Sequence, residues 1–279
     1  MAQFTKALAS DYNTVRNTVA DVLGTGSGTR GYGSSVTSNT VSVGTIITAT
    51  QFTALASDIN ACYRHITNAN ASTLASIVSD GLITWANFVT YQSAATYIDT
   101  NRDTNGGTLT SSQSSKVLSA GWGNASTNRV ASVNFTITFS SADAMRYYFN
   151  QNSYISLSGS GAASGGTPKS DAFGTLANGV SASVNQSNYR AGTGSDQAQT
   201  TGVSPYSSGT ADGISVSLSF NGSIVQGYVS CSDKGGDGTV ASNVDIDLTF
   251  YINLLNISNT AGISAYTPTV SWGAWVYTA

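Results

Sequence analysis

The sequence is poor in charge. Only 9% of its 279 residues are Asp, Glu, Lys or Arg, against roughly 25% in ordinary globular proteins. It contains no glutamate, so all 14 acidic residues are aspartates, and the formal net charge is −3. The 11 Lys and Arg residues form no cluster that would neutralise phosphates, which argues against nucleic-acid binding. Hydrophobic residues still make up 40% of the chain, enough for a core, so disorder is not predicted.

Histidine and cysteine are also scarce. His65 is the one histidine, and Cys62 and Cys231 are the two cysteines. A metal site or a catalytic triad needs partners, and the chain offers neither a second histidine nor a Cys-x-x-Cys pair. We therefore expect a packed or surface His65, free and buried cysteines, and no cofactor.

Long apolar runs are missing as well. No window is apolar over the length of a membrane span, and Met1–Phe4 lacks the basic start of a signal peptide. These absences predict synthesis in the cytoplasm and no membrane partner. Uncharged polar residues fill the space instead, and they cost less to desolvate than Lys or Glu. Such a surface fits a protein covered by neighbours, and a stable extracellular β protein is the alternative.

What the chain does have is an internal repeat. Ala7–Asn13 returns at Ala54–Asn60 with six of seven positions matched, and Leu82–Phe88 more weakly parallels Ile46–Phe52. Repetition of this kind predicts related short helices in the first hundred residues. Because the aspartate of the repeat is placed near a helix start, where the helix dipole favours negative charge, it needs no catalytic role.

Apolar residues spaced three and four apart predict helices over Thr5–Leu23, Thr48–Thr67 and Thr84–Asn101. Thr48 and Thr84 are expected as caps, and Gly24–Gly28 as the end of the first helix. Helices of this kind are not expected to be stable alone, so they should pack against each other or across subunits. The candidate assembly contacts on their stripes are Leu8, Tyr12, Val15, Phe52, Leu55, Ile59, Phe88 and Tyr91.

Beyond Asp103–Gly107 the apolar period changes to two, which divides the chain into a helical docking region, 1–105, and a β domain, 106–279. Strands are expected at Lys116–Trp122, Ala131–Phe139, Tyr154–Ser158, Val180–Val184, Ile214–Phe220, Ser223–Ser230, Val244–Asn253 and Thr269–Tyr277. Asn221-Gly222 is a strong hairpin signal, and one helix is expected at Ala142–Phe149. The predicted fold is α+β: repeated short N-terminal helices followed by an antiparallel β-sandwich or jelly-roll-like domain with one inserted helix.

Three groups of residues are candidates for chemistry. Asp233 and Asp237 partly match a calcium loop, but the third position is glycine and the twelfth is Val244, which favours a plain turn and no metal. Tyr206, Trp272 and Trp275 could contact a host-surface glycan, or could close the ends of a sandwich. Asp245 and Asp247 are expected on one outward strand face. Since hydrolysis of a glycoside needs two carboxylates flanking a groove, no enzyme is predicted.

Several segments resemble a known family. Gly31–Ser34, Val41–Thr48, the set Phe52, Leu55, Asp58, Ile59 and Asn60, and Arg64-His65 look like a module in virion structural proteins of tailed phages. The likeness is to proteins of phages that infect cyanobacteria and other marine bacteria. Ala142–Asn150 is similar to the β-rich half of the same proteins. The resembling parts cover about half of the chain.

The resemblance implies a non-enzymatic, oligomeric virion component, most similar to a tail or neck fibre or a tail accessory protein. Its expected partners are copies of itself and other virion proteins, and its expected location is the virion after synthesis in the host cytoplasm. The alternatives are a glycan-binding receptor module and a capsid decoration protein.

Overall fold

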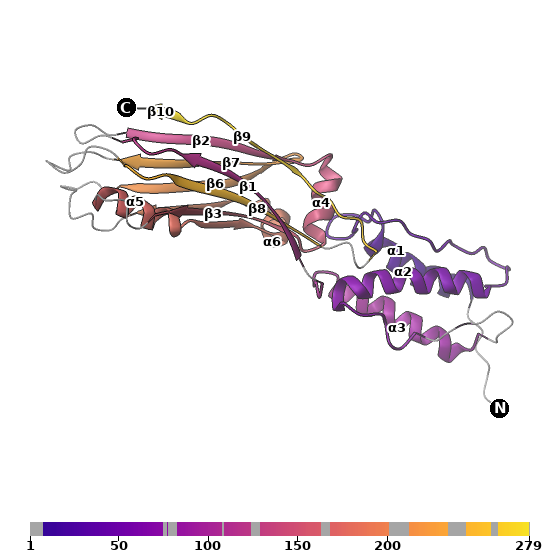
Figure 1. Cartoon of the computed structure of the whole chain (residues 1–279). Helices are drawn as coiled ribbons and strands as arrows, with labels where there is room; N and C mark the ends of the chain where they lie inside the picture. The colour runs from indigo at the N-terminus through magenta and orange to yellow at the C-terminus, as the bar shows by residue number, and fades with distance from the viewer. Residues whose placement is uncertain are drawn as a thin grey trace. The chain divides into compact units, whose positions relative to one another are not determined.

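The computed structural model describes residues 8–74, 77, 83–107, 109–123, 129–162, 168–200, 212–233, 244–257 and 262–278. Its contacts divide the chain into two compact units (Figure 1). The first comprises Met1–Thr110, Arg146–Ser153 and Asn256–Tyr266, and the second comprises Ser111–Met145, Tyr154–Leu255 and Thr267–Ala279. The sequence placed a boundary after residue 105 but gave no sign that two later segments belong to the first unit.

The first unit is built on helices α1, Ala9–Leu23, α2, Ala49–Thr67, and α3, Trp85–Asn101. The caps predicted for α2 and α3 are confirmed. The hydroxyls of Thr48 and Thr84 accept hydrogen bonds from the amides of Gln51 and Asn87, whose side chains bond back to the cap amides. The weak similarity of Leu82–Phe88 to Ile46–Phe52 therefore reflects two helices that begin in the same way.

The three helices run in the same direction, as Figure 1 shows. Near their starts the ring of Phe52 lies 5.5 Å from that of Tyr12 and 5.1 Å from that of Tyr91. Near their other ends, the guanidinium of Arg30 contacts both Asp21 of α1 and Asp99 of α3. Parallel neighbours require long return connections, which are residues 24–48 and 68–84.

The predicted assembly contacts are corrected by the packing. Seven of the eight side chains are at most 3% exposed and form the core of the helical unit: Tyr12, Val15, Phe52, Leu55, Ile59, Phe88 and Tyr91. They hold the helices of one chain to each other, so they are not available to another subunit. Only Leu8, which is 60% exposed, is accessible.

The connector between α1 and α2 is held by the repeat itself. Asp58 accepts hydrogen bonds from the amides and hydroxyls of Thr37 and Ser38. Asn13 exchanges two hydrogen bonds with the backbone of Val41, at 2.8 and 2.9 Å. The expectation that the repeat aspartate sits near a helix start is therefore wrong for Asp58, which lies in the middle of α2 and is 2% exposed.

The second unit holds most of two sheets. The four-stranded sheet has the order β1 (Leu109–Leu118), β8 (Leu248–Ile257), β3 (Tyr154–Gly161) and β4 (Ser181–Val184). The other has the order β10 (Val276–Thr278), β2 (Arg129–Thr138), β7 (Ile224–Asp233), β6 (Gly213–Asn221) and β5 (Ser195–Thr200), with β9 (Thr269–Trp272) also paired to β2. The pairings of β3 with its two neighbours and of β2, β6 and β7 are antiparallel.

The predicted α+β, sandwich-like fold class is confirmed, with several corrections. The part of the chain that the structure describes beyond residue 110 carries α4 (Ala142–Asn150), α5 (Pro168–Asn178) and α6 (Gln186–Ala191) rather than one inserted helix. Strand β1 begins earlier than predicted, β8 begins later, and β5 lies where no strand was predicted. The β6–β7 hairpin turns at Gly222-Ser223, one residue later than predicted, because Asn221 still pairs with Ile224.

The predicted alternation of side chains is confirmed along the central strands. Ala131, Val133, Phe135 and Ile137 of β2 are buried, and the residues between them are half-buried or exposed. In β8, Leu248, Phe250 and Ile252 are fully buried. One face of each sheet therefore packs inward and the other faces outward.

Candidate functional site

Of the large exposed hydrophobic side chains described in the helical unit, four lie where its three helices begin, while Val89 and Tyr97 lie further along α3. Leu8 precedes α1, Val43 and Ile46 precede the cap of α2, and Trp85 is the first residue of α3. Their exposed fractions are 60% for Leu8, 92% for Val43, 87% for Ile46 and 39% for Trp85. We call these four residues the helix-end surface. Exposed apolar side chains at one end of a folded unit are a candidate interaction surface.

Formal charge is sparse among the described residues at these helix starts. Asp11 is the acidic residue in the first turn of α1, and the first turns of α2 and α3 contain none. The dipoles of three parallel helices place partial positive charge at this same end. The surface is therefore apolar with a weak preference for anionic groups around it.

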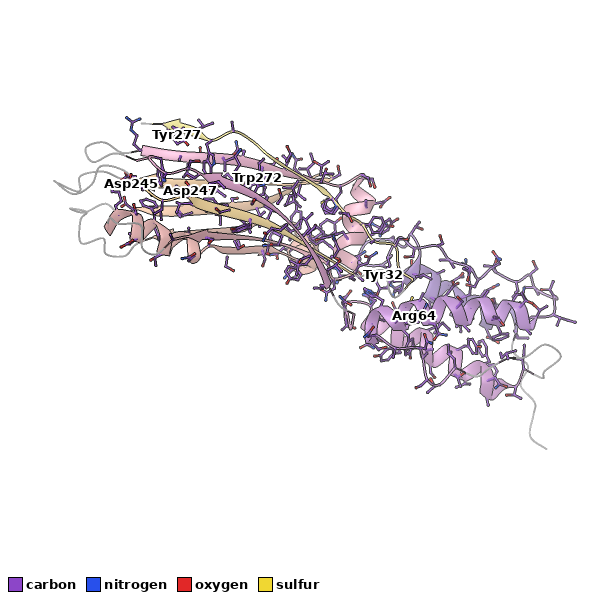
Figure 2. The ribbon with its side chains drawn as sticks, viewed as in Figure 1. Tyr32, Arg64, Asp245, Asp247, Trp272 and Tyr277 are labelled. Carbon is purple, nitrogen blue, oxygen red and sulfur yellow. The ribbon has the colours of Figure 1, made fainter. Side chains whose placement is uncertain are left out.

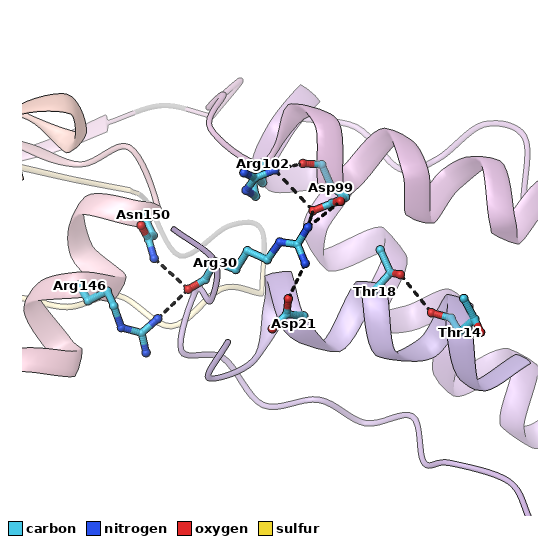
Figure 3. A network of polar contacts seen from close by, with 8 residues as sticks. All are labelled: Thr14, Thr18, Asp21, Arg30, Asp99, Arg102, Arg146 and Asn150. Atoms are coloured by element: carbon cyan, nitrogen blue, oxygen red, sulfur yellow. Dashed lines mark hydrogen bonds and ion pairs between the residues drawn. The ribbon is translucent and has the colours of Figure 1, made fainter. Parts of the chain in front are cut away.

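At the other end of the helical unit, the glycine-rich loop after α1 is held by polar contacts (Figure 3). Arg30 donates to Asp21 at 2.8 Å and to Asp99 at 2.9 Å. The hydrogen bond to Asp21 is the main reason that the pKa of Arg30 is raised above its ordinary value. All three side chains are about one-third exposed, so these ion pairs fix the loop more than they stabilise the unit.

Residues from α4 complete the hold on this loop. Arg146 donates to the carbonyls of Arg30 and Thr25 at 2.6 and 2.8 Å, and the Asn150 amide donates to the carbonyl of Arg30 at 3.0 Å. Gln151 donates to the carbonyls of Tyr32 and Ser264. The loop thus presents carbonyl oxygens to cationic and amide donors, which is the opposite of a phosphate-binding loop, where amides point at the ligand. Its role is to anchor the two later segments of the first unit.

The predicted glycan contacts are in part structural. The indole N–H of Trp272, which is labelled in Figure 2, donates to Ser114 at 3.0 Å. The indole N–H of Trp275 donates to the carbonyl of Val117 at 2.6 Å. The ring of Trp272 packs on Phe135 and that of Trp275 on Phe250. Both indoles thus join the strands of one sheet to β1 of the other. Tyr206, the third candidate, lies outside the described residues.

The candidate metal ligand Asp233 has a different role. It is fully buried at the end of β7, and the Lys169 ammonium of α5 lies 3.1 Å from both of its carboxylate oxygens. The side chain of Lys169 is 5% exposed, so the pair is a buried ion pair that occupies the carboxylate with a cation of the chain itself. Asp237 lies outside the described residues, and no cluster suited to a metal occurs among those that are described.

Asp245 and Asp247 are not strand residues as predicted, because β8 starts at Leu248. Both are exposed near the start of that strand (Figure 2). Asp247 accepts a hydrogen bond from the amide of Ala120 at 2.8 Å, and the amide of Asp245 donates to Ser170. Each of these contacts joins a backbone amide to a side-chain oxygen, and the second ties the start of β8 to α5.

The single histidine is sealed in the helical unit. His65 is fully buried, its ring lies 4.5 Å from that of Tyr32, and neither ring nitrogen has a hydrogen-bond partner among the described residues. Burial lowers the pKa of His65 to about 4, so the ring is neutral at pH 7. Cys62 and Cys231 are free and buried, as predicted, and burial raises the pKa of both thiols.

Sequence reasoning missed Val43 and Ile46 of the helix-end surface. Val43 ends a stretch, residues 36–43, that is typical of an extended connector, and nothing in one sequence distinguishes an exposed connector from a covered one. The signal that could have identified them was their position in the sequence relative to a helix cap. Both residues lie just before Thr48, the cap that the sequence identified, so they had to lie at a helix start.

Comparisons with protein-family models, with curated proteins and with solved structures gave no match. Within the described part of the chain, no helix combines the length and apolar character that a membrane crossing requires.

Proposed function

We propose that this chain is a non-enzymatic structural component of a virus particle, in a tail or neck fibre or as a tail accessory protein. In this proposal it attaches through the helix-end surface to another protein of the particle. The proposal rests on the sequence resemblance for the kind of particle and on the helix-end surface for the mode of attachment.

The observation that carries the attachment is the exposure of Val43 and Ile46, at 92% and 87%. Burying a fully exposed aliphatic or aromatic side chain contributes about 1.5–3 kcal/mol, so the four residues, scaled by their exposed fractions, together supply roughly 4–8 kcal/mol. Association costs about 4–15 kcal/mol in lost freedom of motion. One such contact is therefore reversible, and stable incorporation needs either a larger surrounding interface or several copies attached together.

The partner is a different protein rather than a second copy docked end to end. An isologous contact through this surface would place three helix N-termini against three others, and their partial positive charges would repel. A partner with an apolar patch and acidic or carbonyl-rich surroundings satisfies both features of the surface. Copies of the chain are expected to associate elsewhere, and the mass of the purified protein by light scattering measures this.

The engagement of the polar side chains supports a non-enzymatic role. Asp58 is occupied by backbone amides and hydroxyls, Asp233 by the Lys169 ammonium, and His65 is sealed by aromatic packing. None of these three groups is therefore placed to act as a general acid or base at an open cleft.

The test is incorporation of a Val43→Asp, Ile46→Asp double variant into particles. Mass spectrometry of purified particles should show at least a tenfold loss of the variant, while the isolated protein keeps the far-UV circular dichroism of the wild type. Val276→Asp, at a 56% exposed valine of β10, is the matched control and should be incorporated normally. Normal amounts of the double variant in particles would refute attachment through this surface.

Attachment must be tested with surface variants, because substitutions of the buried residues on the helix stripes would unfold the helical unit. Leu55 is fully buried, so Leu55→Asp would unfold the helical unit and abolish incorporation for a trivial reason. Antibody labelling of intact particles then separates a tail or neck location from capsid decoration.

A further inference from the structure

We infer that the outer face of the larger sheet carries a binding site for a neutral carbohydrate, in a hollow over β2, β6 and β7. The hollow has a volume of about 440 Å³, which falls within the range of roughly 300–1,000 Å³ for small-ligand sites. The side chains around it are Asn134, Thr136, Ser217, Ser219, Gln226 and Tyr228. This inference goes beyond the proposed attachment and concerns another unit of the chain.

The strand register sets these side chains in two rows. Tyr228 of β7 pairs with Ser217 of β6 on one side and Asn134 of β2 on the other. Two residues along the strands, Gln226 pairs with Ser219 and Thr136. Residues two apart on a strand point to the same face, and directly paired residues have neighbouring side chains. The six polar groups therefore form one continuous array around the exposed Tyr228 ring.

The hydrogen-bonding groups of this array are unoccupied by the protein. The side chains of Asn134, Thr136, Ser217, Gln226 and Tyr228 take part in no hydrogen bond within the described structure, and the Ser219 hydroxyl donates to the carbonyl of Gln226 at 3.4 Å. Amide and hydroxyl groups act as both donors and acceptors. A ligand rich in hydroxyl groups matches such an array, and water occupies it in the absence of a ligand.

The floor of the hollow is fixed by packing beneath it. Gly227 lies between the two rows, and a Cβ added there would come 2.0 Å from the carbonyl oxygen of Ser217 and 2.5 Å from Cζ of Phe135. The buried ring of Phe135 thus fills the space under Gly227. Because the ring supports the strand from below, the array is preformed rather than assembled on binding, which reduces the entropic cost of recognition.

The chemistry favours a neutral sugar over other ligands. No charged residue is among the described residues that line the hollow, so a sulfated or carboxylated ligand would find no cation there to pair with its charge. A protein partner is disfavoured because interfaces are depleted in serine and enriched in several aromatic residues and Arg, whereas this array has two serines and one aromatic residue. The 41% exposed ring of Tyr228 offers an apolar surface for the C–H groups of a sugar, next to its own hydroxyl.

A glycan array probed with the full-length chain tests this inference. We expect retention on neutral oligosaccharides and not on an acidic set alone. Tyr228→Ala and Asn134→Ala should each weaken binding at least tenfold, and Tyr228→Phe should weaken it less because the ring remains. Tyr277→Ala removes a tyrosine that is more exposed, at 56%, from outside the hollow and should bind as the wild type does. Far-UV circular dichroism establishes that each variant is folded.

Two outcomes would overturn the inference: no neutral glycan is retained, or retention is unchanged in both Tyr228→Ala and Asn134→Ala. Its failure is distinguishable from failure of the proposed attachment. Tyr228→Ala should be incorporated into particles in normal amounts, whereas Val43→Asp, Ile46→Asp should bind glycans normally as an isolated protein.

Discussion

Asp58 accepts hydrogen bonds from both the amide and the hydroxyl of Ser38, at 2.8 and 2.6 Å. The carboxylate is 2% exposed and also receives the amide and hydroxyl of Thr37. A residue of α2 thereby supplies the hydrogen bonds that the extended connector would otherwise obtain from a strand. The repeat that dominates the N-terminal sequence thus explains how a connector without a sheet stays in place.

The two copies of the repeat provide a matched test of this role. Asp58→Asn places an amide donor against existing donors and should lower the free energy of unfolding by roughly 2–4 kcal/mol. Asp11→Asn changes the equivalent residue, which accepts one exposed hydrogen bond from the amide of Leu8, and should cost less than about 0.5 kcal/mol. Urea unfolding followed at 222 nm, where helices dominate, measures both. Equal losses would contradict the assignment.

The local features of the helical unit could be predicted from sequence, and its assembly could not. Thr48, Thr84 and Gly24 mark helix boundaries because capping depends on residues within one turn. A stripe of apolar residues shows that a face is buried but not what buries it, so Tyr12 and Leu55 were assigned to another subunit rather than to the chain's own core. The parallel direction of the helices depends on connections whose path leaves no periodic signal.

His65 should make the helical unit sensitive to acid. Its pKa is 6.5 ordinarily and about 4 in the folded protein, because burial disfavours the charged ring. As the pH falls, His65 therefore binds a proton in the unfolded chain before it does so in the folded protein. Stability should be complete above pH 6.5 and fall by roughly 3 kcal/mol as the pH drops towards 4.

The control for this pH dependence is His65→Phe, which keeps an aromatic ring against Tyr32 and removes the titrating group. Neither nitrogen of His65 has a hydrogen-bond partner among the described residues, so the substitution leaves no broken bond. Melting temperatures measured between pH 4.5 and 7.5 should fall less steeply for the variant than for the wild type. Parallel curves would show that other groups control the acid response.

The buried pair of Lys169 and Asp233 should show strong coupling. Lys169→Met leaves a buried carboxylate without its cation and should cost about 3–5 kcal/mol. Adding Asp233→Leu to that variant also removes the buried carboxylate, so the double variant should be more stable than Lys169→Met alone. A double-mutant cycle from urea unfolding measures the coupling energy. Additive losses would mean that the two side chains act independently.

The candidate site residues were less predictable than the fold because their role depends on neighbours far away in the sequence. Trp272 and Trp275 are of a residue type typical of sugar-binding surfaces, yet β1 lies beside them and accepts hydrogen bonds from both indole N–H groups. Tyr228 has an ordinary place in an alternating strand. Its neighbours in the array come from β2 and β6, and only strand register brings them together.

Neither cysteine should react in the folded protein. Cys62 and Cys231 are fully buried, and burial raises the pKa of both thiols, so no thiolate is available at pH 7. Treatment with iodoacetamide under native conditions should leave both unmodified by mass spectrometry, whereas treatment in guanidinium should alkylate both. The single variants Cys62→Ser and Cys231→Ser identify which thiol reacts. Rapid alkylation of either thiol under native conditions would contradict its burial.

Gly33 and Gly44 separate the cost of backbone strain from that of close packing. Both have positive φ, +69° and +86°, which costs a residue with a side chain about 1 kcal/mol. A Cβ at Gly33 would also lie 2.0 Å from the hydroxyl of Tyr266 and 2.3 Å from the ring of Tyr147, whereas one at Gly44 would meet nothing within 4 Å. Gly33→Ala should therefore cost at least about 2 kcal/mol more than Gly44→Ala in urea unfolding.

The same pair of variants tests whether the later segments belong to the helical unit. Tyr147 and Tyr266 come from Arg146–Ser153 and Asn256–Tyr266, and Tyr266 donates to the carbonyl of Gly33 at 2.7 Å. Displacing them should speed amide hydrogen exchange in residues 146–153 and 262–266 of Gly33→Ala, with no change in Gly44→Ala. Unchanged exchange in both variants would mean that these segments do not depend on the loop at Gly33.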